Sequence, residues 1–165
     1  MLSKVCSAAV NGVDAYPVEV EVNCAYGDTL IVVVGLPDAA VKESKDRVST
    51  ALVNSGYKFP LGRTTINLAP ADVKKEGPSF DLPIALGILA ASEQLETDQL
   101  DNFVVVGEVP AENAAEAAVV AGLRGIPVQN LREAAQFLEG QIGIAPVAGI
   151  LNPPAPFSLP IPSWN

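Results

Sequence analysis

The chain has no histidine, only two cysteines and one tryptophan among its 165 residues. The missing imidazole excludes every Ser-His and Cys-His catalytic arrangement, because these need it as the base. Two cysteines do not make a disulfide framework. We expect Cys6 and Cys24 to be small buried residues on neighbouring strands in a reducing compartment, while a bridge between them stays open.

Long apolar runs are also missing. No run reaches the ~18 residues that a membrane helix needs, and no basic segment followed by an apolar one opens the chain as it would in a secretory signal. We therefore expect a cytoplasmic protein without a membrane partner. About half of the residues are apolar (49%), which is enough for one domain with a proper core.

Basic residues are scarce in the second half of the chain. The formal net charge is −9, and residues 76–165 carry only two arginines against eleven acidic residues. Because binding to a phosphate backbone depends on Lys and Arg displacing counterions, we expect this domain to bind DNA weakly by itself. One basic cluster is predicted either to be a solvated loop or to face one way around the turn at Ser79; it consists of Lys58, Arg63, Lys74 and Lys75.

Apolar periodicity predicts strands and helices in a mixed order. Strands are expected at residues 5–10, 16–23, 29–34, 65–70 and 103–106, and helices at residues 38–54, 82–91, 111–122 and 130–138. Asp38 is placed at the positive end of the first helix, and Asn130 with Glu133 is typical of a capping box. Mixed strands and helices that begin with a hairpin region predict an α/β two-layer sandwich.

The most informative segment is residues 67–91. A charged loop leads into the turn Gly77-Pro78-Ser79, and a helix then opens at Ser79 or Asp81. From Leu82 to Ala91 this helix is apolar on every side, so it is expected to be buried all round. Ser79 has two interpretations: it is the helix N-cap, or it lies where a nucleophile or a bound anion would sit. The loop acids Asp72, Glu76 and Asp81 lack His or Cys neighbours, so no metal site is predicted.

Several motifs resemble the N-terminal domain of the Mg-chelatase-subunit-I-like (ChlI-type) AAA+ proteins, the YifB or ComM family. They are Gly35-Leu-Pro-Asp38, Val41-Lys-Glu-Ser44, Thr65-Ile-Asn-Leu-Ala-Pro70, Glu76-Gly-Pro-Ser-Phe-Asp-Leu-Pro-Ile-Ala85, Val106-Gly-Glu108 and Pro110-Ala-Glu-Asn-Ala-Ala-Glu-Ala-Ala118. The resemblance implies the fold of ribosomal protein S5 domain 2, shared with the proteolytic domain of Lon. It also implies a chain that continues into an ATPase using ATP and Mg²⁺, assembled as a homo-hexamer.

The sequence departs from the family pattern in two places. No Gly-x-x-x-x-Gly-Lys-Ser/Thr string occurs, so no P-loop is present. Val109 joins Pro110 directly, where the family has a further helix and strand. Either that segment was deleted, or it was left out and the numbering closed over it, and we favour the second. We expect residues 1–144 to form the domain and the proline-rich residues 145–165 to be a linker toward an ATPase domain.

Two functions follow from this sequence. The first is a non-catalytic accessory domain of a Mg-chelatase-like ATPase that assists substrate or DNA engagement in recombination or competence, with no cofactor of its own. The alternative is a Lon-like serine peptidase with Ser79 as nucleophile. Against it, the Lon-type dyad needs a lysine downstream of the serine, and no lysine follows Lys75. Arginine stays protonated and cannot act as the base.

Overall fold

A computed structural model describes residues 1–11, 14–109, 117–121 and 124–146. Its strands form one mixed sheet in the order β3-β4-β2-β1-β5-β6-β7. The strands are β1 (Leu2–Asn11), β2 (Asp14–Ala25), β3 (Leu30–Val34), β4 (Arg63–Ala69), β5 (Val104–Gly107), β6 (Ala117–Ala121) and β7 (Arg124–Val128). The helices are α1 (Ala39–Asn54), α2 (Asp81–Ala91) and α3 (Leu131–Leu138), with short 3₁₀ helices η1 (Pro78–Phe80) and η2 (Leu100–Asn102).

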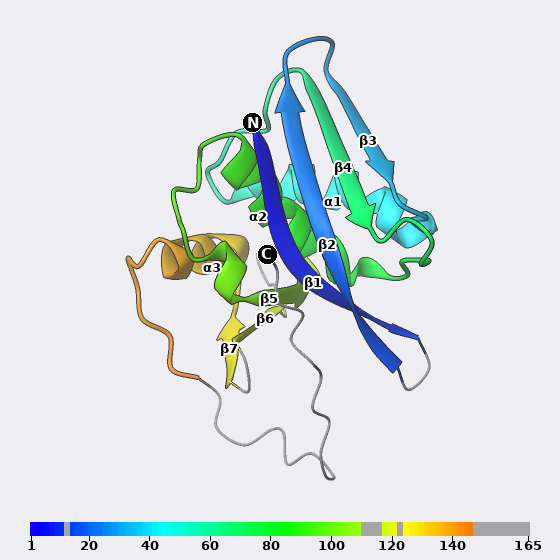
Figure 1. The fold of residues 1–165 in the computed structure, drawn as a ribbon. Coiled ribbons are helices and arrows are strands. Elements are labelled where there is room, and N and C mark those ends of the chain that lie inside the picture. Colours follow the sequence, from blue (N-terminus) through cyan, green and yellow to red (C-terminus); the bar gives the residue numbers. More distant parts are fainter. Residues whose placement is uncertain (12–13, 110–116, 122–123, 147–165) are drawn as a thin grey trace.

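The three α-helices lie on one face of the sheet (Figure 1), which confirms the α/β two-layer sandwich. Strand β2 shows why one face is covered and the other open. Its Val18, Val20 and Val22 are buried beneath the helices, whereas the alternating Glu19 and Glu21 face the other side, as the two-residue period of a strand requires. The more specific likeness to ribosomal protein S5 stays a prediction.

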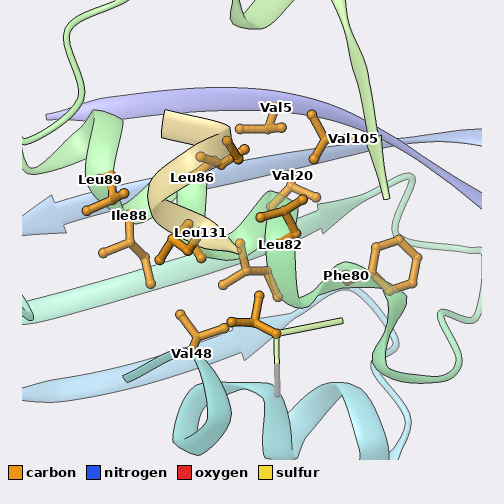
Figure 2. Packing of buried hydrophobic residues seen from close by; sticks show 14 of the residues in the cluster. Val5, Val20, Val48, Phe80, Leu82, Leu86, Ile88, Leu89, Val105 and Leu131 are labelled. Atoms are coloured by element: carbon orange, nitrogen blue, oxygen red, sulfur yellow. The ribbon is translucent and has the colours of Figure 1, made fainter. Parts of the chain in front are cut away.

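Helix α2 occupies the centre of the molecule. Ten of its eleven residues are buried, including all the leucines and isoleucines predicted to be core residues. It packs against β1, β2 and β5 and against both other α-helices, so it has no solvent side. Figure 2 shows Leu82, Leu86 and Leu89 among side chains from the sheet and from the other helices. Gly87 allows the close approach to the sheet, because an added Cβ would lie 2.7 Å from Val22 Cγ2.

The predicted helix at residues 111–122 is wrong where the structure describes it. Ala117–Ala121 is strand β6, which pairs antiparallel with β5 and with β7, and the strand β7 was not predicted. The alanines favour a helix locally, but β-branched Val119 and Val120 suit a strand and the open edge of β5 supplies a partner. Residues 110–116, 122–123 and 147–165 lie outside the described part, and with them the junction after Val109 and most of the predicted linker.

The two cysteines lie on the neighbouring strands β1 and β2, as predicted, but they are half-buried rather than buried. Cys6 is opposite Glu19, whereas Cys24 lies five residues farther along β2 with its sulfur 4.0 Å from Thr64 Oγ1. An odd separation places the two side chains on opposite faces of the sheet, about 16 Å apart along the strand. A Cys6–Cys24 bridge is therefore excluded, and both thiols are free.

Among the described residues, none of the helices combines the length and apolar character that crossing a bilayer requires.

Candidate functional site

The first helix begins at a carboxylate that also holds the loop before α2. Asp38 lies at the positive end of the first helix, as predicted; it is the N-cap of α1, and its Oδ1 accepts a hydrogen bond from the amide of Val41 at 2.8 Å. Its Oδ2 accepts from the amide of Gly77 at 3.1 Å. The amide of Lys75 donates to the Leu36 carbonyl, and the amide of Asp38 donates to the Lys75 carbonyl, both at 3.0 Å. A short parallel bridge between Pro37 and Lys75 thus joins the motif Gly35-Leu-Pro-Asp38 to the loop before α2.

Glycine is required for this arrangement at Gly35, which ends β3. Its φ is +102°, a conformation that side chains rarely adopt, and an added Cβ would lie 2.1 Å from the Leu68 carbonyl oxygen. The tight passage of the backbone beside β4 directs the following residues 36–38 toward the loop before α2.

A buried carboxylate at the start of α2 connects this helix to α1. Asp81 has no exposed surface. Its Oδ1 accepts hydrogen bonds from Ser44 Oγ at 2.5 Å and from Arg47 Nη2 at 3.0 Å, and its Oδ2 accepts from Arg47 Nε at 2.6 Å. The two-pronged pairing of guanidinium and carboxylate is the strongest geometry for such a pair. Together, Asp38, Ser44, Arg47, Gly77 and Asp81 are called here the motif clamp.

Arg47 lies at the edge of the motif clamp, with about a quarter of its side chain exposed. Its Nη2 also donates to the Ala40 carbonyl at 2.7 Å, and its Nη1 lies 3.8 Å from the exposed Glu43. The hydrogen bond with Asp81 raises the pKa of Arg47 most, burial opposes it, and the negative charges of Asp81, Glu43 and Glu108 raise the pKa further. The motif Val106-Gly-Glu108 therefore contributes the negative charge of Glu108 to the surroundings of Arg47.

Ser79 does not cap α2, so the predicted N-cap is wrong. It lies within η1, and the N-cap position of α2 belongs to Phe80, which makes no side-chain capping bond. The 3₁₀ turn carries the chain into the helix without a break, so a capping side chain has no place there. Among the described residues the Ser79 hydroxyl has no hydrogen-bond partner.

Lys75 is buried, although the sequence placed it in a solvated loop or on a basic surface. Its side chain has no exposed surface, and its ammonium donates to the carbonyl of Pro70. Burial lowers its pKa, and the negative charge of Asp72 opposes that shift. The parallel bridge to Pro37 holds the backbone of Lys75 beside residues 36–38, and the Pro70 carbonyl accepts from its ammonium, so the side chain is not in a solvated loop.

The other basic residues do not gather at Ser79. Lys74 is exposed and forms an ion pair with Glu76 at 3.0 Å. Arg63 begins β4, about 20 Å along the strand from the end that leads to this loop. Lys58 is held by Gln94, beyond the far end of α2, through hydrogen bonds of 2.8 and 2.6 Å to its backbone. The predicted cluster is thus divided between the two ends of the domain.

A pH dependence of stability follows from the buried lysine. Because its pKa is lowered on folding, the unfolded chain binds more protons in the window below the ordinary value of 10.5, and stability rises with pH there. We expect urea unfolding to show wild type gaining stability relative to Lys75→Met as the pH rises toward 10.5. Lys74→Met, at an exposed position, is the control: it keeps the buried Lys75 and should keep the gain in stability that Lys75 produces. Parallel profiles for wild type and Lys75→Met would contradict the burial.

Sequence reasoning missed Arg47 and the role of Ser44. Ser44 belongs to the buried stripe of α1, together with Val41, Val48, Ala51 and Leu52. The available signal was Arg47 itself, which lies three residues after Ser44 and directly before the buried Val48, on the border of that stripe. Which buried acid pairs with an arginine at such a border depends on the tertiary structure, so the sequence does not predict it.

The hydrogen bonds of the motif clamp join the start of α1 to the loop before α2 and to α2 itself. In residues 1–11, 14–109, 117–121 and 124–146 there is no group of three or more His, Cys, Asp or Glu that could hold a metal ion. The Lon-like peptidase is not supported: among the described residues Ser79 makes no hydrogen bond to a side chain that could act as its base, and the ammonium of Lys75 is engaged by Pro70.

A comparison with known protein families matches a part of the chain that includes the motif clamp. The family described as "Subunit ChlI of Mg-chelatase" matches residues 20–122. The chain is 48% identical over 126 residues to the uncharacterised protein YifB of Escherichia coli, covering 76% of this chain and 23% of that protein. It is 41% identical over 168 residues to the competence protein ComM of Haemophilus influenzae, covering 85% of this chain and 33% of that protein. An uncharacterised protein of Mycobacterium tuberculosis is 32% identical over 173 residues, covering 87% and 34%.

The chain and its relatives differ in length. The chain spans about a quarter to a third of the length of the curated relatives it matches. Two of these alignments are longer than the 165 residues of the chain, so those relatives contain residues with no counterpart here. The chain belongs to the ChlI family of Mg-chelatase subunits, together with the proteins YifB and ComM.

Proposed function

We propose that this chain is the non-catalytic N-terminal accessory domain of a Mg-chelatase-like AAA+ ATPase. One observation carries the proposal: three motifs of the resemblance, which contain Asp38, Ser44 and Asp81, meet in the motif clamp, where hydrogen bonds engage their polar groups. Asp81, which is bound by an arginine and a serine, and Asp38, which is bound by the amide at the start of α1, stabilise a domain rather than react with a substrate. The larger size of the relatives leaves room for the motor elsewhere in the parent protein.

We place the remaining activities in that parent. ATP and Mg²⁺ would bind its ATPase domain, and its ring would be a homo-hexamer in the cytoplasm. One relative is named a competence protein, and we extend this to DNA as the substrate that the domain helps to engage. The domain would then position DNA for the motor during recombination, without holding it tightly.

Removal of residues 1–144 from the full-length parent tests the accessory role. We expect the truncated protein to keep basal ATP hydrolysis and to lose DNA processing, because the motor remains while its substrate is no longer positioned. Lys45→Ala in the intact parent is the control for nonspecific loss, since it removes one exposed charge on α1, away from the Ser79 turn, and leaves the motif clamp intact. Unchanged ATP hydrolysis, assembly and DNA processing after truncation would refute the proposal.

Weak and salt-dependent DNA binding is the corresponding prediction for this chain alone. Lys75 is buried and Lys74 is paired, so few cations are available near the Ser79 turn. The amide of Gly77 in that turn is already bound to Asp38, which leaves less for an added phosphate. We expect titration with labelled single-stranded DNA to give affinity that falls steeply with salt.

Two variants locate this binding. Lys74→Ala should weaken it and make the slope of log affinity against log salt shallower by about 0.7, the contribution of one phosphate contact on a single strand. Arg63→Ala, at the other end of β4, should have no effect if the Ser79 turn is the contact surface. Tight binding that salt does not change would place the recognition surface elsewhere.

A further inference from the structure

Strand β3 lies at one margin of the sheet with one side unpaired (Figure 1). It pairs in parallel with β4, and no second strand of the described residues pairs with it. Its sequence, Leu-Ile-Val-Val-Val, has no charge, proline or glycine. Natural proteins usually protect such an edge with charged residues, prolines or bulges, because an apolar open edge recruits another strand.

Exposed apolar side chains are concentrated around this edge. Leu30 and Val34 are 50% and 41% exposed, and Leu36, just past the strand, is 51% exposed. Tyr26 and Leu61 are almost fully exposed; they flank Gly62, whose carbonyl accepts from the amide of Leu30 at the start of the strand. The apolar surface therefore runs along β3 from its first residue to beyond its last.

The backbone of β3 has a definite set of unused groups. The amide of Leu30 donates to the Gly62 carbonyl at 3.3 Å, which directs the backbone groups of Leu30, Val32 and Val34 toward β4. By the alternation of a strand, the amide and carbonyl groups of Ile31 and Val33 point to the unpaired side. These groups lie symmetrically about Val32.

We propose that β3 is a self-association edge, at which a second copy of this chain adds its own β3 in antiparallel orientation about Val32. Ile31 would then lie opposite Val33 of the second copy, and the reverse, so that each pair exchanges two backbone hydrogen bonds. A two-fold axis through Val32 makes the interface isologous and closed, as in most homodimers. The two sheets would become one, with the helices of both copies on the same side.

Charge and side-chain order favour a second copy as the occupant. Residues 29–37 contain no charged side chain, so two chains of net charge −9 meet where neither carries charge. In this register Leu30 faces Val34 of the second copy on the open face of the sheet, and Val32 faces Val32. The apolar side chains of β3 on this face, Leu30, Val32 and Val34, are thereby matched with one another. The proposal does not depend on the proposed function.

Sedimentation of the 165-residue chain over a concentration series tests the edge. We expect wild type to rise toward twice the monomer mass and Val32→Lys to stay monomeric, because two lysines would oppose each other at the axis. Val32→Glu should also stay monomeric, and an equimolar mixture of the two variants should recover the dimer, which a folding defect would not allow. Val104→Lys is the matched control, because Val104 is also a valine on the open face and is 39% exposed.

A cross-link tests the register. In a background with Cys6 and Cys24 replaced by alanine, Val32→Cys should oxidise to a covalent dimer, because directly opposed residues of a non-hydrogen-bonded pair have Cα atoms about 4.5 Å apart. Val104→Cys in the same background should not. A wild type that stays monomeric, a Val32→Lys variant that associates like wild type, or the absence of the Val32→Cys cross-link would each overturn the proposal.

Discussion

Asp81→Ala is expected to lower the free energy of unfolding by about 3–5 kcal/mol, measured by urea denaturation. The carboxylate of Asp81 is fully buried and is the partner of Arg47 through two hydrogen bonds. Removing it leaves a partly buried guanidinium without its counter-charge and deprives Ser44 of its acceptor. The loss therefore includes both the pair and the cost of the unpaired charge.

A double-mutant cycle separates these two contributions. Arg47→Met should also destabilise the fold, since Asp81 would then keep only the Ser44 hydroxyl. The double variant should lose less than the sum of the single losses, by about 0.5–3 kcal/mol, as expected for groups in direct contact. Glu43→Ala is the control: its carboxylate is 71% exposed and 3.8 Å from Arg47, so a change within about 0.5 kcal/mol is expected. Unfolding curves of wild type and Asp81→Ala that coincide would contradict the role given to the pair.

Leu86→Ala is expected to cost about 2–5 kcal/mol, from lost burial of the side chain and from the cavity that remains. Leu86 has no exposed surface and lies in the middle of α2, between the sheet and the other helices (Figure 2). Thermal or urea unfolding measures the loss. Leu61→Ala is the matched control, because Leu61 is 88% exposed and its truncation should change stability by no more than about 0.5 kcal/mol. Equal losses for the two variants would mean that the core had been misplaced.

Features encoded within one short segment could be predicted from the sequence. The all-apolar run from Leu82 to Ala91 indicates a helix without a solvent side, and α2 is buried in that way. The caps Asp38 and Asn130 act over three residues, on the amides of Val41 and Glu133. Such signals depend on local spacing, which the sequence displays directly.

Features that depend on distant segments were missed or wrong. Arg47 and Asp81 are 34 positions apart, so the sequence around one residue does not indicate that it pairs with the other. Lys75 is buried where a bridge to Pro37 holds its backbone and the Pro70 carbonyl accepts from its ammonium, and β6 is a strand because β5 offers it an edge. In both of these cases tertiary contacts override the local preference. The polar character of Lys75 alone favours a solvated loop, and the alanine content of residues 111–122 alone favours a helix.

The position of α2 has a consequence for the way the molecule opens. A helix covered on every side cannot fray into water while the sheet and the other helices stay in place. Its central amides should therefore exchange with deuterium only through complete unfolding, at a free energy equal to that of the whole domain. Helix α1, which leaves Lys42, Lys45 and Asp46 in solvent, would exchange sooner, through smaller local openings.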